Sequence, residues 1–553
     1  MTQTEIADLI VTNAVVRTMD PAQPSAEAFA VAGGKLLAVG SAADVEAYKG
    51  ATTRIVDLDG QAVMPGLMDV HNHHGIAGLH NVFELKFPDT ASVDDICTAV
   101  QGYIAEHPDA EWVHGSIWGS QLLGELSTSG PLKQLDAISG DKKVILTDDS
   151  HHNRFANTAA MRAAGIEDDT PNPPSGGVIV RDEDGRPTGL LFEGAGVMVS
   201  KAAAKADPMT TDKAAACSAD AIKTMHAVGV TAFLDAGATL HTLNGLKELD
   251  DRGELKIWAS SCMLINDHVF GAEQLGEELF PHREVTRSAH HRPDFAKIFL
   301  DGVPMSYTGA FLEPYLPSES HGCAHKGHTT MPYAELEHWL LHCAAKGINV
   351  KVHCCGDASV RFVLDAVAKV RAAGHADTLF HVAHGQFVNP DDIKRFRELG
   401  VVADISPPLW FPSILVEAME AVRPAEDIAR IAPNRSLAES GAIISGGSDW
   451  PVMPDPNPWT GIAGLITRAD PTGQHPGQLA PDQAISIDQA LAAYTINTAR
   501  ALGIEAFTGS LTVGKSADFV VLDRDPYGVA PEKLASTVVR ETWFEGEKVY
   551  TKA

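Results

Sequence analysis

The sequence predicts an α/β fold, a (β/α)8 TIM-like barrel with a metal site at the C-terminal strand ends. A small β-sandwich domain from both termini and an inserted α+β arm complete the prediction. Three observations lead to it. Apolar strand-like runs alternate with helical segments in the middle of the chain, as in a parallel sheet. Short β-type runs lie near both ends, and ligand-type side chains follow several of the middle strands.

Composition and charge set broad limits. The 553 residues are enough for a large barrel and accessory parts, and 44% hydrophobic with 21% charged residues is ordinary globular composition. Lys and Arg number 43 against 72 Asp and Glu, a formal charge of −29, which disfavours nucleic acid and anionic membranes as partners. Seven cysteines without a CxxC pair favour a reducing compartment. With no basic signal-peptide start and no apolar run of about 18 residues, we expect a cytoplasmic protein.

Both ends of the chain contain short β-type runs. Near the N-terminus these are "DLIVTNAVVRTMD", "AFAVAGGKLLAVG" and "TRIVDLDGQAVMPG", separated by turn residues, which is an antiparallel pattern. "GSLTVGKSADFVVLDRD" and "STVVRETWFEGEKVY" have the same character near the C-terminus. We therefore expect residues 1–64 and 505–553 to form one composite β-sandwich domain.

The barrel is expected over residues 65–504. Its candidate strands are near-continuous apolar runs, typical of parallel strands buried on both faces. Between two of them, Asn389 as N-cap, Pro390 in the first turn and Gly400 as a stop predict a helix. The candidates are "AVMPGLMDVH", "KVILTDD", "VTAFLDAG", "KIWASSCML", "FAKIFLDG", "NVKVHCCGD", "TLFHVAHG", "VVADISP" and "AIISGGSDW".

These nine candidates exceed the eight strands of such a barrel by one. Roughly 160 residues separate Val70 from Val230, far beyond the about 2–6 residues of an ordinary connection. We therefore assign "KVILTDD" to an insertion over residues 80–215 that lies over the active site. A Pro- and Gly-rich part of it, "TPNPPSGGVIVRDEDGRPTG", predicts a hairpin.

Metal-ligand side chains come at the ends of the candidate strands, on the face where barrel active sites lie. His71 and His73 stand at i and i+2 and can face one ion. An HxH pair alone is weak evidence in a chain with 24 histidines. Lys297 lies inside an otherwise apolar strand, where an unpaired charge is costly and carboxylation would remove it. Strand-end positions are also held by His353, His384 and Asp449. Imidazole and carboxylate ligands suit Zn, and also Fe or Mn.

These segments resemble the motifs of the amidohydrolase superfamily, specifically its amidohydrolase-3 type of metal-dependent hydrolases, nearly end to end. The resemblance is carried by "MPGLMDVHNH", "KIFLDG", "VHCCGDASV", "VAHGQFV", "GGSDWPV" and the C-terminal "YTINTARALGIEAFTGSLTVGKSADFVVLDRDP". "DSHHNRFANTAAM" resembles a substrate-side motif in which a histidine and an asparagine recur five residues apart, here His152 and Asn157.

The resemblance implies a binuclear, Zn-type site, although some relatives use one ion or another bridge. One ion would be held by His71, His73 and Asp449, the other by His353 and His384, with carboxylated Lys297 between them. A metal-activated hydroxide would attack a carbonyl-type carbon while Asp449 acts as general base and then general acid. His152 is expected to bind the substrate or its oxyanion, or to be structural.

Several further residues have two readings. Glu193 and Asp301 are acidic residues that would either contact metal or orient a ligand. His74 leaves the ligand face at i+3 and is expected in a loop or behind the ligands. Cys354 and Cys355 are expected to be packing residues, because no base is identifiable for a thiol nucleophile. Loop tryptophans predict either a wall for an apolar or aryl substrate or loop packing; they are Trp118, Trp410, Trp450 and Trp459.

The leading functional hypothesis is hydrolysis of a non-peptide C–N bond in an amide, formamide or cyclic amide. N-substituted formamide deformylation is the nearest named activity of the type that the sequence resembles. Ester or lactone hydrolysis and deamination remain alternatives, because pocket shape selects the leaving atom. A non-catalytic regulatory relative would be expected to lack ligands, and here every expected position is filled. The resemblance also suggests a homodimer and a small-molecule substrate.

Overall fold

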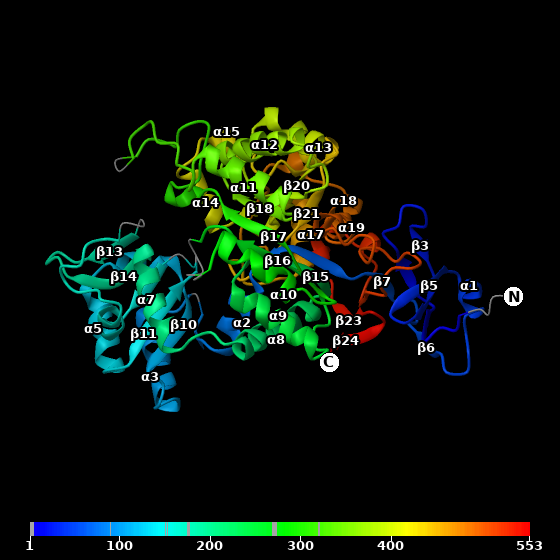
Figure 1. Ribbon diagram of the computed structural model, residues 1–553, viewed down its shortest axis with the longest axis horizontal. Coiled ribbons are helices and arrows are strands. Elements are labelled where there is room, and N and C mark those ends of the chain that lie inside the picture. Colours follow the sequence, from blue (N-terminus) through cyan, green and yellow to red (C-terminus); the bar gives the residue numbers. More distant parts are fainter. Residues whose placement is uncertain are drawn as a thin grey trace.

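The computed structural model describes residues 5–88, 90–149, 151, 153–173, 177–267, 272, 274–318 and 321–552. Its centre is a nearly closed, all-parallel eight-stranded sheet (Figure 1). The strands, in the order in which they lie side by side, are β21 (Ile444–Gly446), β20 (Val401–Ile405), β19 (Phe380–His384), β18 (Asn349–Cys354), β17 (His291–Phe299), β16 (Trp258–Leu264), β15 (Val230–Ala238) and β8 (Leu67–Asn72). The barrel predicted from the sequence is thus confirmed, and each of its eight predicted strands is present.

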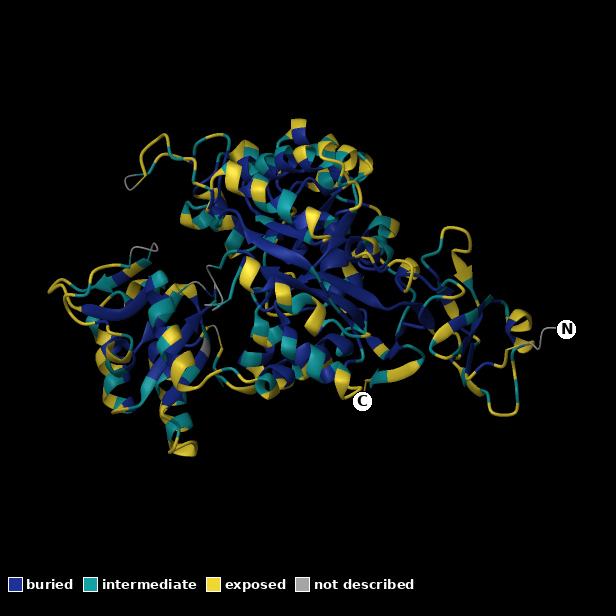
Figure 2. Ribbon diagram, in the orientation of Figure 1, coloured by how far each residue is buried: buried dark blue, intermediate teal, exposed yellow. Residues whose placement is uncertain are grey.

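Helices surround the barrel, and the strands at its centre are buried while the helices expose their outer sides (Figure 2). The predicted helix after Val388 forms as a short turn capped by Asn389, followed by α13 (Ile393–Leu399), which ends at Gly400 with a left-handed φ of 63°. The surrounding helices include α8 (Thr211–Ala227), α9 (Leu240–Asp251), α11 (Tyr333–Ala345), α12 (Asp357–Ala372), α13 (Ile393–Leu399), α16 (Asn434–Glu439), α17 (Pro458–Thr467), α18 (Ile487–Ala493) and α19 (Ile496–Leu502). Among the described residues, no helix is both long enough and apolar enough to cross a membrane.

The seam between β8 and β21 is joined by bonds just beyond the end of β21. The backbone N–H of Asp449 donates to the carbonyl of His71 at 2.8 Å, and that of His73 donates to Trp450 at 2.7 Å. The buried carboxylate of Asp69 accepts from the N–H of His71 at 2.9 Å, and from the N–H and hydroxyl of Ser448 at 3.1 and 2.6 Å. The first and last barrel strands are therefore fixed to one another where the candidate ligands emerge.

A second sheet lies between β8 and β15 in the sequence, next to α2 (His74–Val82), and forms the separate lobe at the left of Figure 1. "KVILTDD" is β11 in this sheet and not a barrel strand. Its strands, in spatial order, are β13 (Gly177–Arg181), β14 (Pro187–Glu193), β12 (Asn153–Ala156), β11 (Lys143–Asp148), β10 (Trp112–Trp118) and β9 (Leu85–Lys86). Helices α3 (Val93–Glu106), α5 (Ser129–Ser139), α6 (Thr158–Ala163) and α7 (Gly194–Ala206) accompany them.

Strands from both ends of the chain pair with one another at the right of Figure 1. One sheet has the order β5 (Lys35–Gly40), β4 (Ala28–Ala32), β1 (Leu9–Thr12) and β6 (Arg54–Asp57). The other has the order β24 (Glu547–Thr551), β23 (Val539–Phe544), β22 (Phe519–Leu522), β7 (Ala62–Pro65), β2 (Val15–Arg17) and β3 (Ser25–Ala26). The pairing is not purely antiparallel as expected, because β1 with β6 and β2 with β7 run parallel across long connections.

Candidate metal centre

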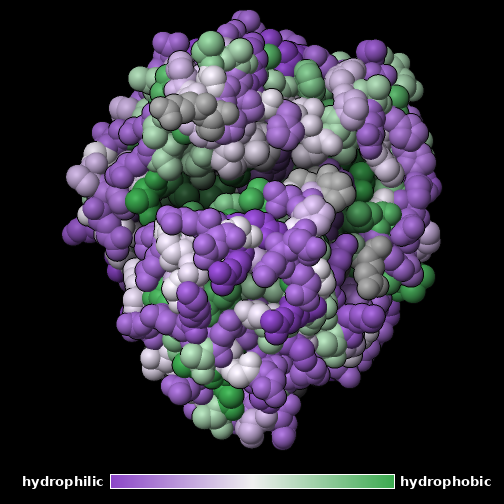
Figure 3. Space-filling view, turned by 90° about the vertical axis from the view of Figure 1, so that its left-hand side faces the viewer, coloured by the Kyte–Doolittle hydropathy of each residue, from purple (hydrophilic) through white to green (hydrophobic). Residues whose placement is uncertain are grey.

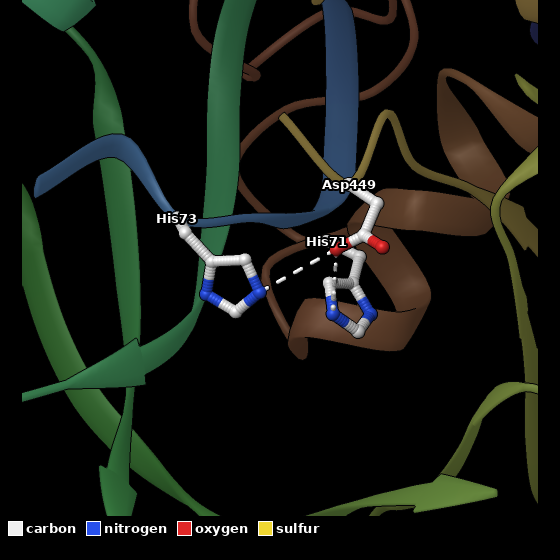
Figure 4. A group of neighbouring side chains, drawn as sticks. All are labelled: His71, His73 and Asp449. Atoms are coloured by element: carbon white, nitrogen blue, oxygen red, sulfur yellow. Dashed lines mark ion pairs between the residues drawn. The ribbon is translucent and has the colours of Figure 1, made fainter. Parts of the chain in front are cut away.

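His71, His73 and Asp449 converge at the seam between β8 and the segment after β21 (Figure 4). His71 Nε2 lies 3.5 Å and His73 Nε2 lies 3.4 Å from the same oxygen, Oδ1 of Asp449. Both distances exceed an ordinary N–H···O hydrogen bond of about 2.7–3.2 Å. Donor atoms bound about 2.0–2.2 Å from one tetrahedral ion are separated by about 3.3–3.6 Å. The three side chains are thus spaced as ligands of a common cation.

The other predicted ligands lie beside this group. The ring of His384 is 4.6 Å from that of His71 and 4.7 Å from that of His353, centroid to centroid. Lys297 has no exposed surface, and its Nζ has no hydrogen-bond partner among the residues described. Burying a polar atom without a partner is costly. The unpaired state of Lys297 therefore fits a lysine whose amino group is modified, and the modified group could contact a cation.

Backbone conformation and ionisation also fit a ligand site. His384 and Asp449 adopt left-handed φ values of 68° and 57°, a strained state that is common at functional sites. Burial lowers the pKa of His71 and His384 well below the ordinary imidazole value, so both rings are neutral and able to donate a lone pair. Burial, reinforced by the charge of Lys351, lowers the pKa of Lys297 to about 8.

Two polar residues that sequence reasoning missed lie behind His71. Asp404 on β20 and Lys351 on β18 have no exposed surface, and Lys351 Nζ donates hydrogen bonds to Asp404 and to the carbonyl of Val70, the latter at 2.7 Å. Asp404 Oδ2 lies 3.0 Å from His71 Nδ1. Lys351 stands two residues before His353, hence on the same side of the strand, and this was the signal that could have found it.

Asp301 and Cys355 lie next to Nε2 of His353. Asp301 Oδ1 is 3.6 Å and Cys355 Sγ is 3.4 Å from His353 Nε2. The Asp301 carboxylate also accepts four hydrogen bonds of 2.8–3.0 Å, from the backbone of Ala310, Cys355 and Gly356 and from the hydroxyl of Ser359. Three of these bonds go to Oδ2 and one to Oδ1, so Asp301 holds the chain around His353. Asp301, His353 and Cys355 also form a second group of side chains that could hold an ion, so both alternatives for Asp301 remain. Burial nevertheless raises its pKa to about 6.

His74 and Asn72, the neighbours of the HxH pair, face away from Asp449. His74 Nε2 lies 3.1 Å from the hydroxyl of Ser218 on α8, and its Nδ1 lies 3.5 Å from Asp235 on β15. Asn72 contacts Met225 Sδ at 3.7 Å. His74 therefore connects the ligand-bearing segment to its neighbours, as expected for a histidine behind the ligands.

The structure gives Asn157 a structural position instead of the substrate-binding one that was predicted. Its side chain is fully buried at the start of α6, and Oδ1 accepts from the N–H groups of Val144 and Ala160 at 3.0 and 2.9 Å. Its Nδ2 donates to the Ser139 hydroxyl and to the Lys142 carbonyl, both at 2.8 Å. These four bonds use the whole capacity of a primary amide, so none remains for a substrate.

The tryptophans that the sequence predicts either as an aromatic wall or as loop packing are all buried. Trp118 is fully buried in the inserted sheet and donates to the Leu146 carbonyl at 3.1 Å. Trp410 and Trp459 are buried in the barrel core, and Trp450 is buried against Ala77 and Ala221. Burial of this degree favours packing, one of the two alternatives that the sequence left open. Contact of these tryptophans with the substrate stays a prediction. His152 lies outside the described residues, and Glu193 ends β14 in the inserted sheet.

Figure 3 shows the molecule from the side of the inserted lobe, and a hollow crosses this face above the lobe. Hydrophobic residues occupy much of its lining, whereas the surrounding surface is largely hydrophilic. The hollow is thus a largely apolar surface on the side of the molecule where the inserted lobe lies.

An eight-stranded parallel barrel with these ligand-type side chains at its carboxyl ends defines a metal-dependent hydrolase. The chain belongs to the amidohydrolase family, whose sequence model, described as "Amidohydrolase family", matches residues 54–550. It is an amidohydrolase, of the class of hydrolases that act on carbon–nitrogen bonds other than peptide bonds.

Similar proteins cover nearly the whole chain. The N-substituted formamide deformylase of Arthrobacter pascens is 29% identical over 99% of both chains. Protein LONG AFTER FAR-RED 3 of Arabidopsis thaliana is 28% identical over 99% of this chain and 92% of its own. The crystal structure of an uncharacterized metal-dependent hydrolase from Pyrococcus horikoshii OT3 has a TM-score of 0.76 at 22% identity, over 95% of this chain and 99% of that one. This structural similarity shows the fold.

Proposed function

We propose that the protein hydrolyses a non-peptide C–N bond in an amide, formamide or cyclic amide, with Asp449 as general base and acid. The observation that carries this proposal is the position of Asp449 Oδ1, 3.5 and 3.4 Å from two imidazole nitrogens of His71 and His73. A carboxylate in this position can both contact an ion and exchange a proton with a water bound there. The similarity to a formamide deformylase across the whole chain supports the choice of bond.

The donor set fits a divalent cation of the Zn type, either two ions bridged by a carboxylated Lys297 or one. His71 Nε2 and His384 Nδ1 are buried and have no hydrogen-bond partner among the described residues. Lone pairs without a donor, next to a carboxylate, are the atoms that a cation would satisfy. His71, His73 and Asp449 would hold one ion, and His353 and His384 the other.

When bound, the metal supplies Lewis acidity and lowers the pKa of a coordinated water towards about 7. Asp449 then accepts the proton of the attacking water and returns it to the leaving nitrogen, because its carboxylate lies beside the imidazoles of His71 and His73 that would hold the ion. The strained backbone at Asp449 and its bond to the His71 carbonyl hold that carboxylate in place.

For the substrate we propose a small molecule with an apolar or aryl group. The support for this is the hydrophobic lining of the hollow in Figure 3. His152 stays a candidate for contact with the substrate or its oxyanion.

The test combines metal analysis with a panel of N-substituted formamides, acyl amides, cyclic amides, lactones and carbamates. Hydrolysis of a formamide or amide that requires a bound transition metal would support the proposal. A purified protein that holds no such metal and gains no activity on reconstitution would contradict it, and selective lactone or carbamate hydrolysis would replace the C–N assignment.

The role of Asp449 has its own test. Asp449→Asn keeps the size of the side chain and removes the proton acceptor, so turnover should fall by about 10²–10⁴-fold while most of the metal stays bound. Steady-state kinetics and elemental analysis on the same preparation measure both quantities. A fully active variant would rule out proton transfer by Asp449.

A further inference from the structure

A chain of buried polar groups behind the metal centre connects three barrel strands. Lys351 on β18 donates to Asp404 on β20, and Asp404 Oδ2 in turn lies 3.0 Å from Nδ1 of His71 on β8. The same Lys351 ammonium donates to the carbonyl of Val70, the residue before His71, at 2.7 Å. None of the three side chains has exposed surface.

We propose that Lys351 is a positioning residue for the metal ligand His71 and that it acts through Asp404. The proposal rests on the metal-dependent function proposed above. An ionised carboxylate can only accept, so the hydrogen bond to Asp404 places a proton on Nδ1 of His71 and leaves the lone pair on Nε2, the atom that faces Asp449. Lys351 fixes the carboxylate from one side and the backbone beside His71 from the other.

Charge balance explains why a lysine is needed. A buried carboxylate without a counterion is costly, and would be expected to take up a proton or draw in water. Lys351 lies beside Asp404 and donates a hydrogen bond to it, so the His71 ring keeps a fixed acceptor at a constant place. Lys351 and Lys297 are direct neighbours on β18 and β17, yet only Lys351 has these partners. The two buried lysines therefore have different tasks.

An ordinary structural role for the same network would stabilise the barrel without affecting the metal. The two roles can be separated with Lys351→Met and with the double variant Lys351→Met, Asp404→Leu. The double variant removes both charges, and replacement of a buried ion pair by apolar residues of similar volume is often tolerated by the fold. His291→Phe is the matched control, since His291 is a fully buried, hydrogen-bonded histidine of β17 that contacts Ser261 and Thr286 instead of the site.

The holoprotein and its variants are titrated with a chelator, the retained metal is counted, and the visible spectrum of the Co²⁺-loaded protein is recorded with the thermal midpoint. We expect Lys351→Met and the double variant to bind metal about 10–100-fold more weakly, with altered Co²⁺ bands, while His291→Phe keeps both properties of the wild type whatever its loss of stability. A folded double variant with wild-type metal affinity and an unchanged Co²⁺ spectrum would overturn the positioning role of Lys351 but would leave the proposed function standing. A wild-type protein that binds no transition metal would overturn the proposed function, and this inference with it.

Discussion

At the scale of the residue, hydrogen bonding distinguishes Asn157 and Asp301 from the equally inaccessible Lys297 and His384. Asn157 makes four hydrogen bonds and Asp301 accepts four, and both hold chain segments together. Lys297 Nζ and His384 Nδ1, which are equally buried, have none among the residues that the structure describes. Beside the imidazoles of His71 and His353, unpaired groups such as these two are ones that a bound cation or a modification would satisfy.

Asn157→Ala tests the structural assignment. The substitution leaves the N–H groups of Val144 and Ala160 without their acceptor, and each unpaired buried group costs about 1–3 kcal/mol. We expect a clearly lower urea and thermal midpoint, with metal content and kcat unchanged below the transition. Asn457→Ala is the control, because Asn457 caps α17 with one bond to Trp459 and a lost cap costs about 1 kcal/mol. A stable Asn157→Ala protein with a strongly raised KM would restore the substrate-binding role.

At the scale of the element, the ends of the strands are set by close backbone approach. A Cβ on Gly447 would lie 2.8 Å from the Cβ and 2.9 Å from the backbone nitrogen of His71. The glycine pair of "GGSDW" thus lets the segment after β21 reach β8, so that Asp449 and the HxH pair meet.

Gly447→Ala should consequently displace His71 while leaving most of the barrel intact. Displacements of about 1 Å can cost 10²-fold in rate, so we expect a drop of at least about 10-fold in metal affinity and kcat/KM. Chelator titration and kinetics provide the measurement. Gly102→Ala on α3, where an added Cβ meets nothing within 4 Å, should be neutral or slightly stabilising. If Gly447→Ala keeps wild-type metal affinity, the backbone at the seam can move enough to accept the added Cβ without displacing His71.

The sequence predicted the barrel strands because parallel strands buried on both faces appear as continuous apolar runs. It pointed to the candidate ligands because they follow those runs, and His71, His73 and Asp449 do lie together in the structure. Other features depend on contacts between distant segments. Lys297 and Lys351 both interrupt apolar strands, and only the pairing of Lys351 with Asp404 separates their roles. Asn157 lies in a segment that resembles a substrate-side motif. Its hydrogen-bond partners Val144 and Ser139 are distant in the sequence and come next to it only when the inserted sheet folds. The orientation of the tryptophans likewise depends on packing between elements.

At the scale of the whole molecule, burial of neutral histidines makes stability depend on pH. Burial lowers the pKa of His226 and His291 to about 4, and that of His381 to about 3. In the unfolded chain these imidazoles titrate near 6.5. Below pH 6.5 the unfolded state binds protons that the native state does not, so their contribution to stability is complete above pH 6.5 and is lost as the pH falls towards 4. Buried carboxyls with raised pKa, such as Asp69 at about 6, act in the opposite direction, so single variants are needed to isolate the effect.

His226→Gln isolates one of these groups. His226 Nε2 lies 3.0 Å from the carbonyl of Lys256, and a glutamine can keep this hydrogen bond without titrating. Relative to the variant, the wild type should lose stability between pH 6.5 and 4, by up to about 3 kcal/mol at 1.36 kcal/mol per pKa unit. Urea midpoints at pH 7.5, 6 and 5 measure the difference. Parallel pH profiles of the two proteins would contradict the low pKa of His226.

The meeting of the two ends of the chain also has a consequence for synthesis on the ribosome. Asp69 and Ser448 bond across 379 positions, and β7 pairs with β22 over a still longer stretch. At about 5–20 residues per second, the early strands emerge about 20–90 s before their partners exist. During that time β7 and β8 have open edges on apolar strands, which are prone to join other chains. We therefore expect the nascent protein to depend on protection of its first strands until β21 and β22 emerge and close the barrel and the terminal sheet.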